Sequence, residues 1–149
     1  MSLFPEDDII CMTDNKFINM ISSGKAFEKL IAEHLRKTYP KNDVKEQIKV
    51  GKYIGGKKNY VVDILFNHDI LVSAKYQGTG GTAEQKIMLE MANLQKLCDK
   101  DGYKQAYLVY DGPGFTLIDT YLSEEMKEYS YRPSVKMLSF EEFKELKIV

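Results

Sequence analysis

An aspartate and a lysine near the middle of the chain each interrupt an apolar segment. Asp63 lies within residues 60–66 and Lys75 within residues 69–77, and the polar residues 67–68 separate the two segments. A carboxylate and an ammonium in a half-buried sheet are costly unless they pair with each other or serve chemistry. The two charges therefore indicate either a structural ion pair at a sheet margin or a catalytic site.

The alternation of side chains along the two segments predicts that these charges lie close together. Successive side chains of a strand point to opposite faces, so Ser73, Lys75 and Gln77 form a polar row on one face of the second strand. The short polar break between the segments predicts an antiparallel hairpin. That hairpin brings Asp63 towards the end of the second strand that carries Lys75.

A helix after the glycine-rich loop contributes two more acids. Its apolar stripe comprises Ala83, Ile87, Met91, Leu94, Leu97 and Cys98. Thr82 and Gln85 fit a capping box, which predicts that the helix begins near residue 83. Glu84 lies in the first turn, where the helix dipole favours an acid. Glu90 lies between members of the stripe, so we expect its side chain to point along the buried face.

The order of Asp63 and Ser73-x-Lys75 resembles the core motif of the PD-(D/E)XK nuclease superfamily. Val62-Asp63 stands for the Pro-Asp of that motif, and Ser73-x-Lys75 stands for its acid-x-Lys. Some restriction endonucleases of this superfamily carry Ser at the same position and supply the missing acid from the following helix. The resemblance therefore indicates a type II restriction endonuclease-like variant of the motif.

By this resemblance the missing acid comes from Glu90, fifteen residues after Lys75, or from Glu84; we favour Glu90. Glu28, in a helix predicted ahead of the hairpin, matches the first-helix glutamate that many of these nucleases aim into the metal site, where it would act through a water molecule. Its place at the edge of an apolar stripe also fits a surface acid whose stem covers apolar neighbours.

The resemblance also implies a chemistry, the metal-assisted hydrolysis of DNA phosphodiester bonds. Asp63, Glu90 (or Glu84) and the backbone carbonyl of Ala74 would hold Mg²⁺, for which Mn²⁺ can substitute. Lys75 would orient the attacking water and stabilise the charge that develops on the phosphate.

The pattern of helices and strands predicts one domain over residues 1–149. Its class is α/β, with the mixed sheet typical of α+β proteins. Apolar residues at helical spacing predict a helix from residue 13 or 14 to just before Pro40, either kinked or divided into two helices at residues 22–24. Ser123 and Ser139 mark two later helix starts. Strands are expected at residues 44–54, 60–66, 69–77, 105–110 and 135–138, and a further short strand or extended segment at 115–119. The order α-β-β-β-α-β resembles the restriction endonuclease-like core, a mixed sheet flanked by helices, and predicts that strands 69–77 and 105–110 run parallel.

The segment 41–58 is the one basic cluster of the sequence, with six lysines against two acids. Lysines are common on edge strands, where they prevent association between sheets. Beside a nuclease-like site, the same charges would contact DNA phosphates. The candidate nucleic-acid-binding residues are Lys49, Lys52, Lys57, Lys58, Gln77 and Thr79.

The composition of the chain is that of an ordinary soluble globular domain. It has 149 residues, of which 44% are hydrophobic and 29% charged. The formal net charge of −1 does not by itself mark a nucleic-acid-binding protein. Two cysteines, and the lack of a signal peptide or an apolar run long enough to span a bilayer, predict a cytoplasmic protein without a membrane partner.

The size of the chain bears on its partners. Cleavage of double-stranded DNA by so small a protein implies a homodimer, or a larger specificity subunit beside it. Two other functions stay open, namely a Holliday-junction or other structure-selective nuclease of the same fold, and a non-catalytic DNA-binding module with a degenerate site. Preferential cleavage of junctions selects the first, and DNA binding without any nicking selects the second.

Overall fold

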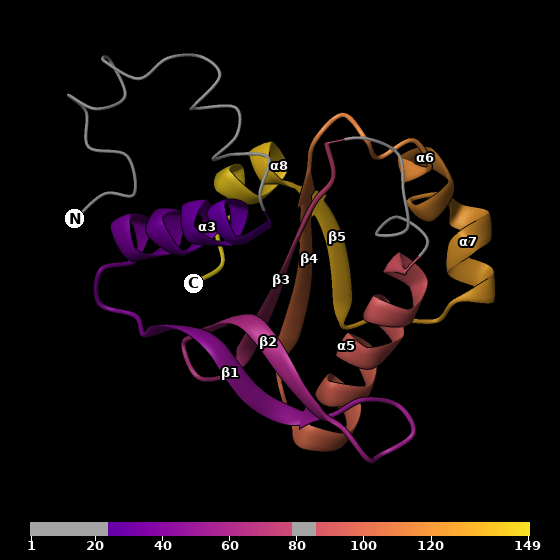
Figure 1. Ribbon diagram of the computed structural model, residues 1–149, viewed down its shortest axis with the longest axis horizontal. Helices are drawn as coiled ribbons and strands as arrows, with labels where there is room; N and C mark the ends of the chain where they lie inside the picture. Colours follow the sequence, from indigo (N-terminus) through magenta and orange to yellow (C-terminus); the bar gives the residue numbers. More distant parts are fainter. Residues whose placement is uncertain (1–23, 79–85) are drawn as a thin grey trace.

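A mixed five-stranded sheet lies at the centre of the computed structural model (Figure 1). The structure describes residues 24–78 and 86–149. The strands, whose order in the sheet is also their order in the chain, are β1 (Val44–Lys52), β2 (Asn59–Phe66), β3 (Ile70–Tyr76), β4 (Gln105–Asp111) and β5 (Val135–Ser139). The strands β1, β2 and β3 pair antiparallel, whereas β3, β4 and β5 pair parallel. The predicted parallel crossover between the third and fourth strands is therefore confirmed.

Helices cover both faces of this sheet, as the sequence predicted. They are α3 (Gly24–Thr38), α5 (Ile87–Asp101), α6 (Ile118–Tyr121), α7 (Glu124–Tyr129) and α8 (Phe140–Glu145). The extended segment expected at 115–119 is wrong at its end, because α6 begins at Ile118. In Figure 1, α3 and α8 lie on one side of the sheet, and α5, α6 and α7 lie on the other. None of the described helices is long and apolar enough to cross a membrane.

The apolar stripes of the two long helices form the core on either side of the sheet. Phe27, Ile31 and Leu35 recur at helical spacing on α3 and are almost completely buried. The side of α5 that faces the sheet buries Ile87, Met91, Leu94 and Leu97. The described part of α5 begins at Ile87, and the capping box predicted at Thr82 lies outside the described residues.

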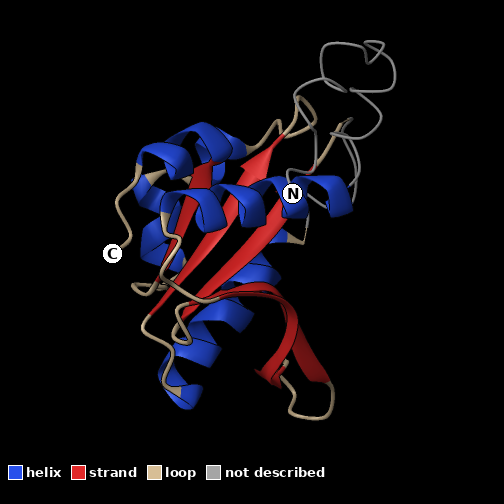
Figure 2. Cartoon of the chain, turned by 90° about the vertical axis from the view of Figure 1, so that its left-hand side faces the viewer, coloured by secondary structure: helices blue, strands red, loops and turns tan. Residues whose placement is uncertain are grey.

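β2 and β3 pair over a short distance and then separate. Their register runs from Phe66–Ile70 to Ile64–Val72, and the β1–β2 hairpin then curves away from the other strands (Figure 2). The twist carries side chains of one strand into different cores, because Ile64 packs on the α3 side and Val62 on the α5 side. Beyond this point Asp63 of β2 and Ser73 and Lys75 of β3 lie on strand segments that no longer pair with each other.

The end of β1 differs from the prediction. The strand was expected to continue to residue 54, but it ends at Lys52, and Ile54 is 52% exposed. A β-bulge before Gly51 shifts the register with β2 and therefore changes the alternation of faces. The backbone at this bulge approaches α5 so closely that a Cβ on Gly51 would lie 2.6 Å from Leu97 Cδ2, which explains the glycine.

Candidate active site

Asp63 lies on β2 at the point where β2 and β3 separate. Backbone pairing between the strands ends at Ile64 and Val72. Beyond this pair, the carboxylate of Asp63 binds the backbone of β3 in place of the β2 backbone. Its Oδ2 accepts a hydrogen bond from the backbone N–H of Ala74 at 2.8 Å. This bond satisfies an amide that the divergence of the strands would otherwise leave without a partner. It also fixes the carboxylate beside the strand that carries Lys75.

The surroundings of Asp63 disfavour its negative charge. Burial raises the pKa of Asp63 above its ordinary value of 3.8, and the negative charge of Glu90 adds to this effect. The Ala74 N–H, the charge of Lys75 and the amide of Gln47 oppose it. The net direction is upward, because the effect of burial outweighs these opposing contacts.

Glu90 projects from the first turn of α5 towards β3, as its place in the apolar stripe predicted. Its Oε1 accepts a hydrogen bond from the hydroxyl of Ser73 at 2.9 Å and another from the hydroxyl of Tyr60. Lys75 Nζ lies 3.9 Å from the same oxygen. Asp63, Lys75 and Glu90 thus lie in one neighbourhood, and their catalytic roles stay predictions.

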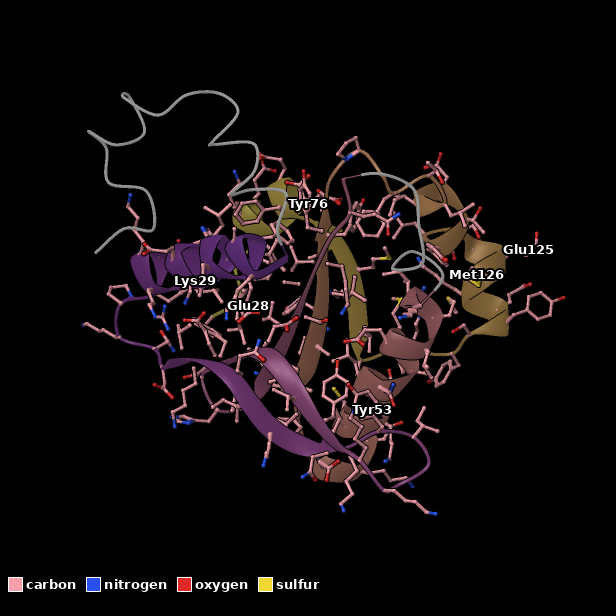
Figure 3. All side chains as sticks on the ribbon, viewed as in Figure 1. Glu28, Lys29, Tyr53, Tyr76, Glu125 and Met126 are labelled. Carbon is pink, nitrogen blue, oxygen red and sulfur yellow. The ribbon has the colours of Figure 1, made fainter. Side chains whose placement is uncertain are left out.

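Glu28 lies on the face of α3 that is turned towards the hairpin (Figure 3). Its side chain is only 8% exposed, so the alternative of a surface acid is wrong. Its Oε2 accepts a hydrogen bond from Gln47 Nε2 at 2.8 Å, and the same nitrogen lies 3.4 Å from Asp63 Oδ1. Burial raises the pKa of Glu28, and the charges of Asp63 and Glu46 raise it further.

Two residues of this site were missed in the sequence. Gln47 lies among alternating polar and apolar residues, and only the register of β1 on β2 places it opposite Asp63. Tyr60 was taken as part of an apolar strand face. A buried tyrosine needs a partner for its hydroxyl, and this requirement was the available signal. Burial and the negative charge of Glu90 raise the pKa of Tyr60, so its hydroxyl stays protonated and donates to Glu90.

A family model described as a PD-(D/E)XK nuclease superfamily domain matches residues 19–147. The chain belongs to this superfamily. Comparison with the curated proteins and with the solved structures found no match. Asp63 lies on β2 and Ser73-x-Lys75 on β3, the two strands that separate, and Glu90 of α5 lies beside Lys75.

The oxygen donors near Lys75 fit a hard divalent cation, the kind of ion that PD-(D/E)XK nucleases typically use. Asp63 and Glu90 offer carboxylates, and Ala74 offers a backbone carbonyl on the adjoining strand. Burial raises the pKa of Asp63, and the charge of Glu90 raises it further, so a positive charge beside both carboxylates would favour their ionised forms. Among residues 24–78 and 86–149, however, no three acidic, histidine or cysteine side chains form a ready metal cluster.

The predicted DNA-binding lysines lie on the β1–β2 hairpin and the turn that closes it. Lys49, Lys52, Lys57 and Lys58 are all exposed. The ion pairs formed within the described residues do not include any of the four. These charges are therefore available to a phosphate backbone. Two other predicted site residues, Thr79 and Glu84, lie outside the described residues.

Gln77 occupies a position that suits a structural role better than the predicted DNA contact. It is only 7% exposed, and its Nε2 donates to the carbonyl of Gly114 at 3.0 Å. Its backbone N–H donates to Asp111, and its carbonyl accepts from the N–H of Gly114. The segment after β3 is thereby tied to the segment after β4.

This placement predicts the effect of Gln77→Ala. The free energy of unfolding of the variant should be about 1–2 kcal/mol lower than that of the parent, because the buried Gly114 carbonyl loses a donor. DNA affinity, measured at one salt concentration where both proteins are folded, should be unchanged. An unchanged melting temperature together with weaker binding would instead support the DNA contact.

Proposed function

We propose that this protein is a metal-dependent endodeoxyribonuclease that hydrolyses phosphodiester bonds in double-stranded DNA, of the restriction type or the cleavage subunit of such an enzyme. The observation that carries the proposal is the grouping of Asp63, Lys75 and Glu90 where β2 and β3 separate, in a chain of the PD-(D/E)XK superfamily. A merely structural Asp–Lys pair does not explain why Lys75 lies beside Glu90, nor why two hydroxyl groups also donate to Glu90.

Each residue of the group has a distinct task in this mechanism. Asp63 and Glu90, with the Ala74 carbonyl, would hold Mg²⁺, which supplies positive charge beside the scissile phosphate when it is bound. Lys75 orients the attacking water and stabilises the negative charge that develops on the phosphate oxygens. Ser73 donates a hydrogen bond to Glu90 and so keeps its carboxylate turned towards β3.

The proposal is tested by incubating the purified chain with plasmid DNA and Mg²⁺ and sequencing the ends that form. Cleavage that requires Mg²⁺ or Mn²⁺ supports the nuclease function. Defined ends indicate a restriction-type enzyme, whereas preference for a branched junction over a linear duplex indicates a structure-selective nuclease. DNA binding without any nicking would show a non-catalytic module. A homodimer, or a partner subunit with its own specificity, would supply the second site that duplex cleavage needs.

The hairpin lysines should carry much of the electrostatic affinity for DNA. Replacing Lys49, Lys52, Lys57 and Lys58 together by Gln should weaken binding to every sequence and make it less dependent on salt. If all four contact phosphates, the slope of log affinity against log salt should fall by about 3 to 4. Binding is measured without a divalent cation, so that cleavage does not interfere.

A matched control neutralises as many lysines elsewhere on the molecule. Lys127, Lys136, Lys144 and Lys147 lie on α7, β5, α8 and the C-terminal segment, and all are exposed. Replacing these four by Gln should leave most of the salt slope in place. If the control lowers the slope and the hairpin variant does not, DNA binds a different surface.

A further inference from the structure

Gln47 has a backbone conformation that a strand does not normally contain. Its φ is 55°, in the left-handed region, although it is not a glycine. Its neighbours on both sides keep regular pairing with β2, since Glu46 pairs with Ile64 and Ile48 with Val62. A left-handed residue of this kind persists only where its surroundings impose it, and such residues concentrate at functional sites.

The left-handed conformation places the side-chain amide of Gln47 between two carboxylates. The amide nitrogen of Gln47 donates to Glu28 Oε2 at 2.8 Å and approaches Asp63 Oδ1 at 3.4 Å. One NH₂ group thus joins a carboxylate of α3 to a carboxylate of β2. The other oxygen of Asp63 is already bonded to the N–H of Ala74, so Gln47 takes the remaining one.

The amide therefore occupies the position for which a cation would compete. Two nearby carboxylates repel each other, and an N–H donor between them relieves part of that repulsion, as a divalent ion would. Without a cation, the amide oxygen of Gln47 cannot lie between Glu28 and Asp63, because it would face two negatively charged oxygens. The residue remains exposed, so the amide can turn outwards without disturbing the core.

We propose that Gln47 is a positioning residue that holds Glu28 and Asp63 together in the metal-free protein and releases Asp63 Oδ1 when a divalent cation binds. The inference rests on the proposed metal-dependent function. The amide acts as an internal competitor of the cation: it keeps the two acids in place, and its contact with Asp63 must be given up on binding.

The test compares Mn²⁺ binding by the parent and by Gln47→Gly, measured by calorimetry without DNA. Glycine accepts the left-handed conformation, so the variant removes the amide without adding backbone strain. Because one competing hydrogen bond, long at 3.4 Å, is removed, Mn²⁺ should bind roughly threefold to tenfold more tightly. In EDTA, Gln47→Ala should melt at a lower temperature than the parent, because the two carboxylates lose their shared donor while both residues adopt the same left-handed conformation.

Three controls make the result specific. In the Asp63→Asn background, replacing Gln47 by Gly should no longer change Mn²⁺ binding. Gln47→Ala should melt below Gln47→Gly, the reverse of the usual order in a strand, because alanine must adopt the left-handed conformation. Gln47→Asn tolerates that conformation, but its amide is shorter by one methylene, so it should also bind Mn²⁺ more tightly than the parent.

The possible failures are distinguishable from one another. Unchanged Mn²⁺ affinity in Gln47→Gly would overturn the inference and leave Gln47 a purely structural residue. Weaker affinity would also overturn it, since the amide oxygen would then be a ligand rather than a competitor. If the parent binds no Mn²⁺ at all, the proposed function fails together with the inference.

Discussion

Replacing Lys75 by Ala should lower DNA cleavage by at least about a hundredfold, the scale of one lost preorganised contact to the transition state. The fold and DNA binding should be retained. Lys75 is 32% exposed, and the carboxylate beside it, Glu90, keeps its hydrogen bonds from Ser73 and Tyr60 when the ammonium is removed. Single-turnover cleavage at saturating Mg²⁺, together with a melting curve, measures both properties.

Lys136→Ala is the matched control for this variant. Lys136 is an exposed lysine of β5, at the opposite edge of the sheet from the hairpin, and its replacement should leave cleavage near the parent rate. Cleavage that survives in Lys75→Ala would remove Lys75 from the mechanism. A loss of several kcal/mol of stability with cleavage unchanged would instead identify a structural ion pair.

Asp63→Asn should abolish cleavage, and it should raise the melting temperature of the metal-free protein at neutral pH. Burial raises the pKa of Asp63 in the folded chain above 3.8, so the folded state binds this proton more tightly than the unfolded state. The ionised carboxylate therefore lowers the free energy of unfolding above the raised pKa, and this penalty disappears as the pH falls to 3.8 or below. Asparagine avoids the penalty and can still accept from Ala74.

Melting curves in EDTA, taken from neutral pH down to the ordinary carboxyl pKa, check this prediction. The advantage of the variant should be largest at neutral pH, at about 2–4 °C for each kcal/mol of penalty removed, and should shrink as the pH falls. Because the charge of Asp63 also raises the pKa of Glu28, the difference between the curves reports Asp63 together with its effect on Glu28. With saturating Mg²⁺ the order should reverse, because only the parent gains from the bound ion. A variant that is less stable than the parent at neutral pH in EDTA would show that the charge of Asp63 stabilises the fold.

The features that are set by residues close together in the sequence could be predicted from the sequence alone. The 3.6-residue period of α5 placed Glu90 on the face that meets β3, and the two-residue periodicity of β3 placed Ser73 and Lys75 together on the opposite face from Val72. The capping box of α8, with Ser139 and Glu142 bonded reciprocally, was likewise legible as a local pattern. These features depend on residues a few positions apart, whose geometry the helix or strand itself determines.

The rest of the site depends on where β2 and β3 stop pairing. The end of this pairing determines which side chains come into contact. The twist of the hairpin separates β2 from β3, leaves the N–H of Ala74 to Asp63, and aligns Gln47 with both Asp63 and Glu28. Tyr60 of β2 donates a hydrogen bond to Glu90 of α5. Strand twist and register are collective properties of the packed sheet, so no local pattern in the sequence marks Gln47 or tells a buried Glu28 from an exposed one. The motif residues follow from local periodicity, whereas the partners that hold them in place are set by tertiary packing.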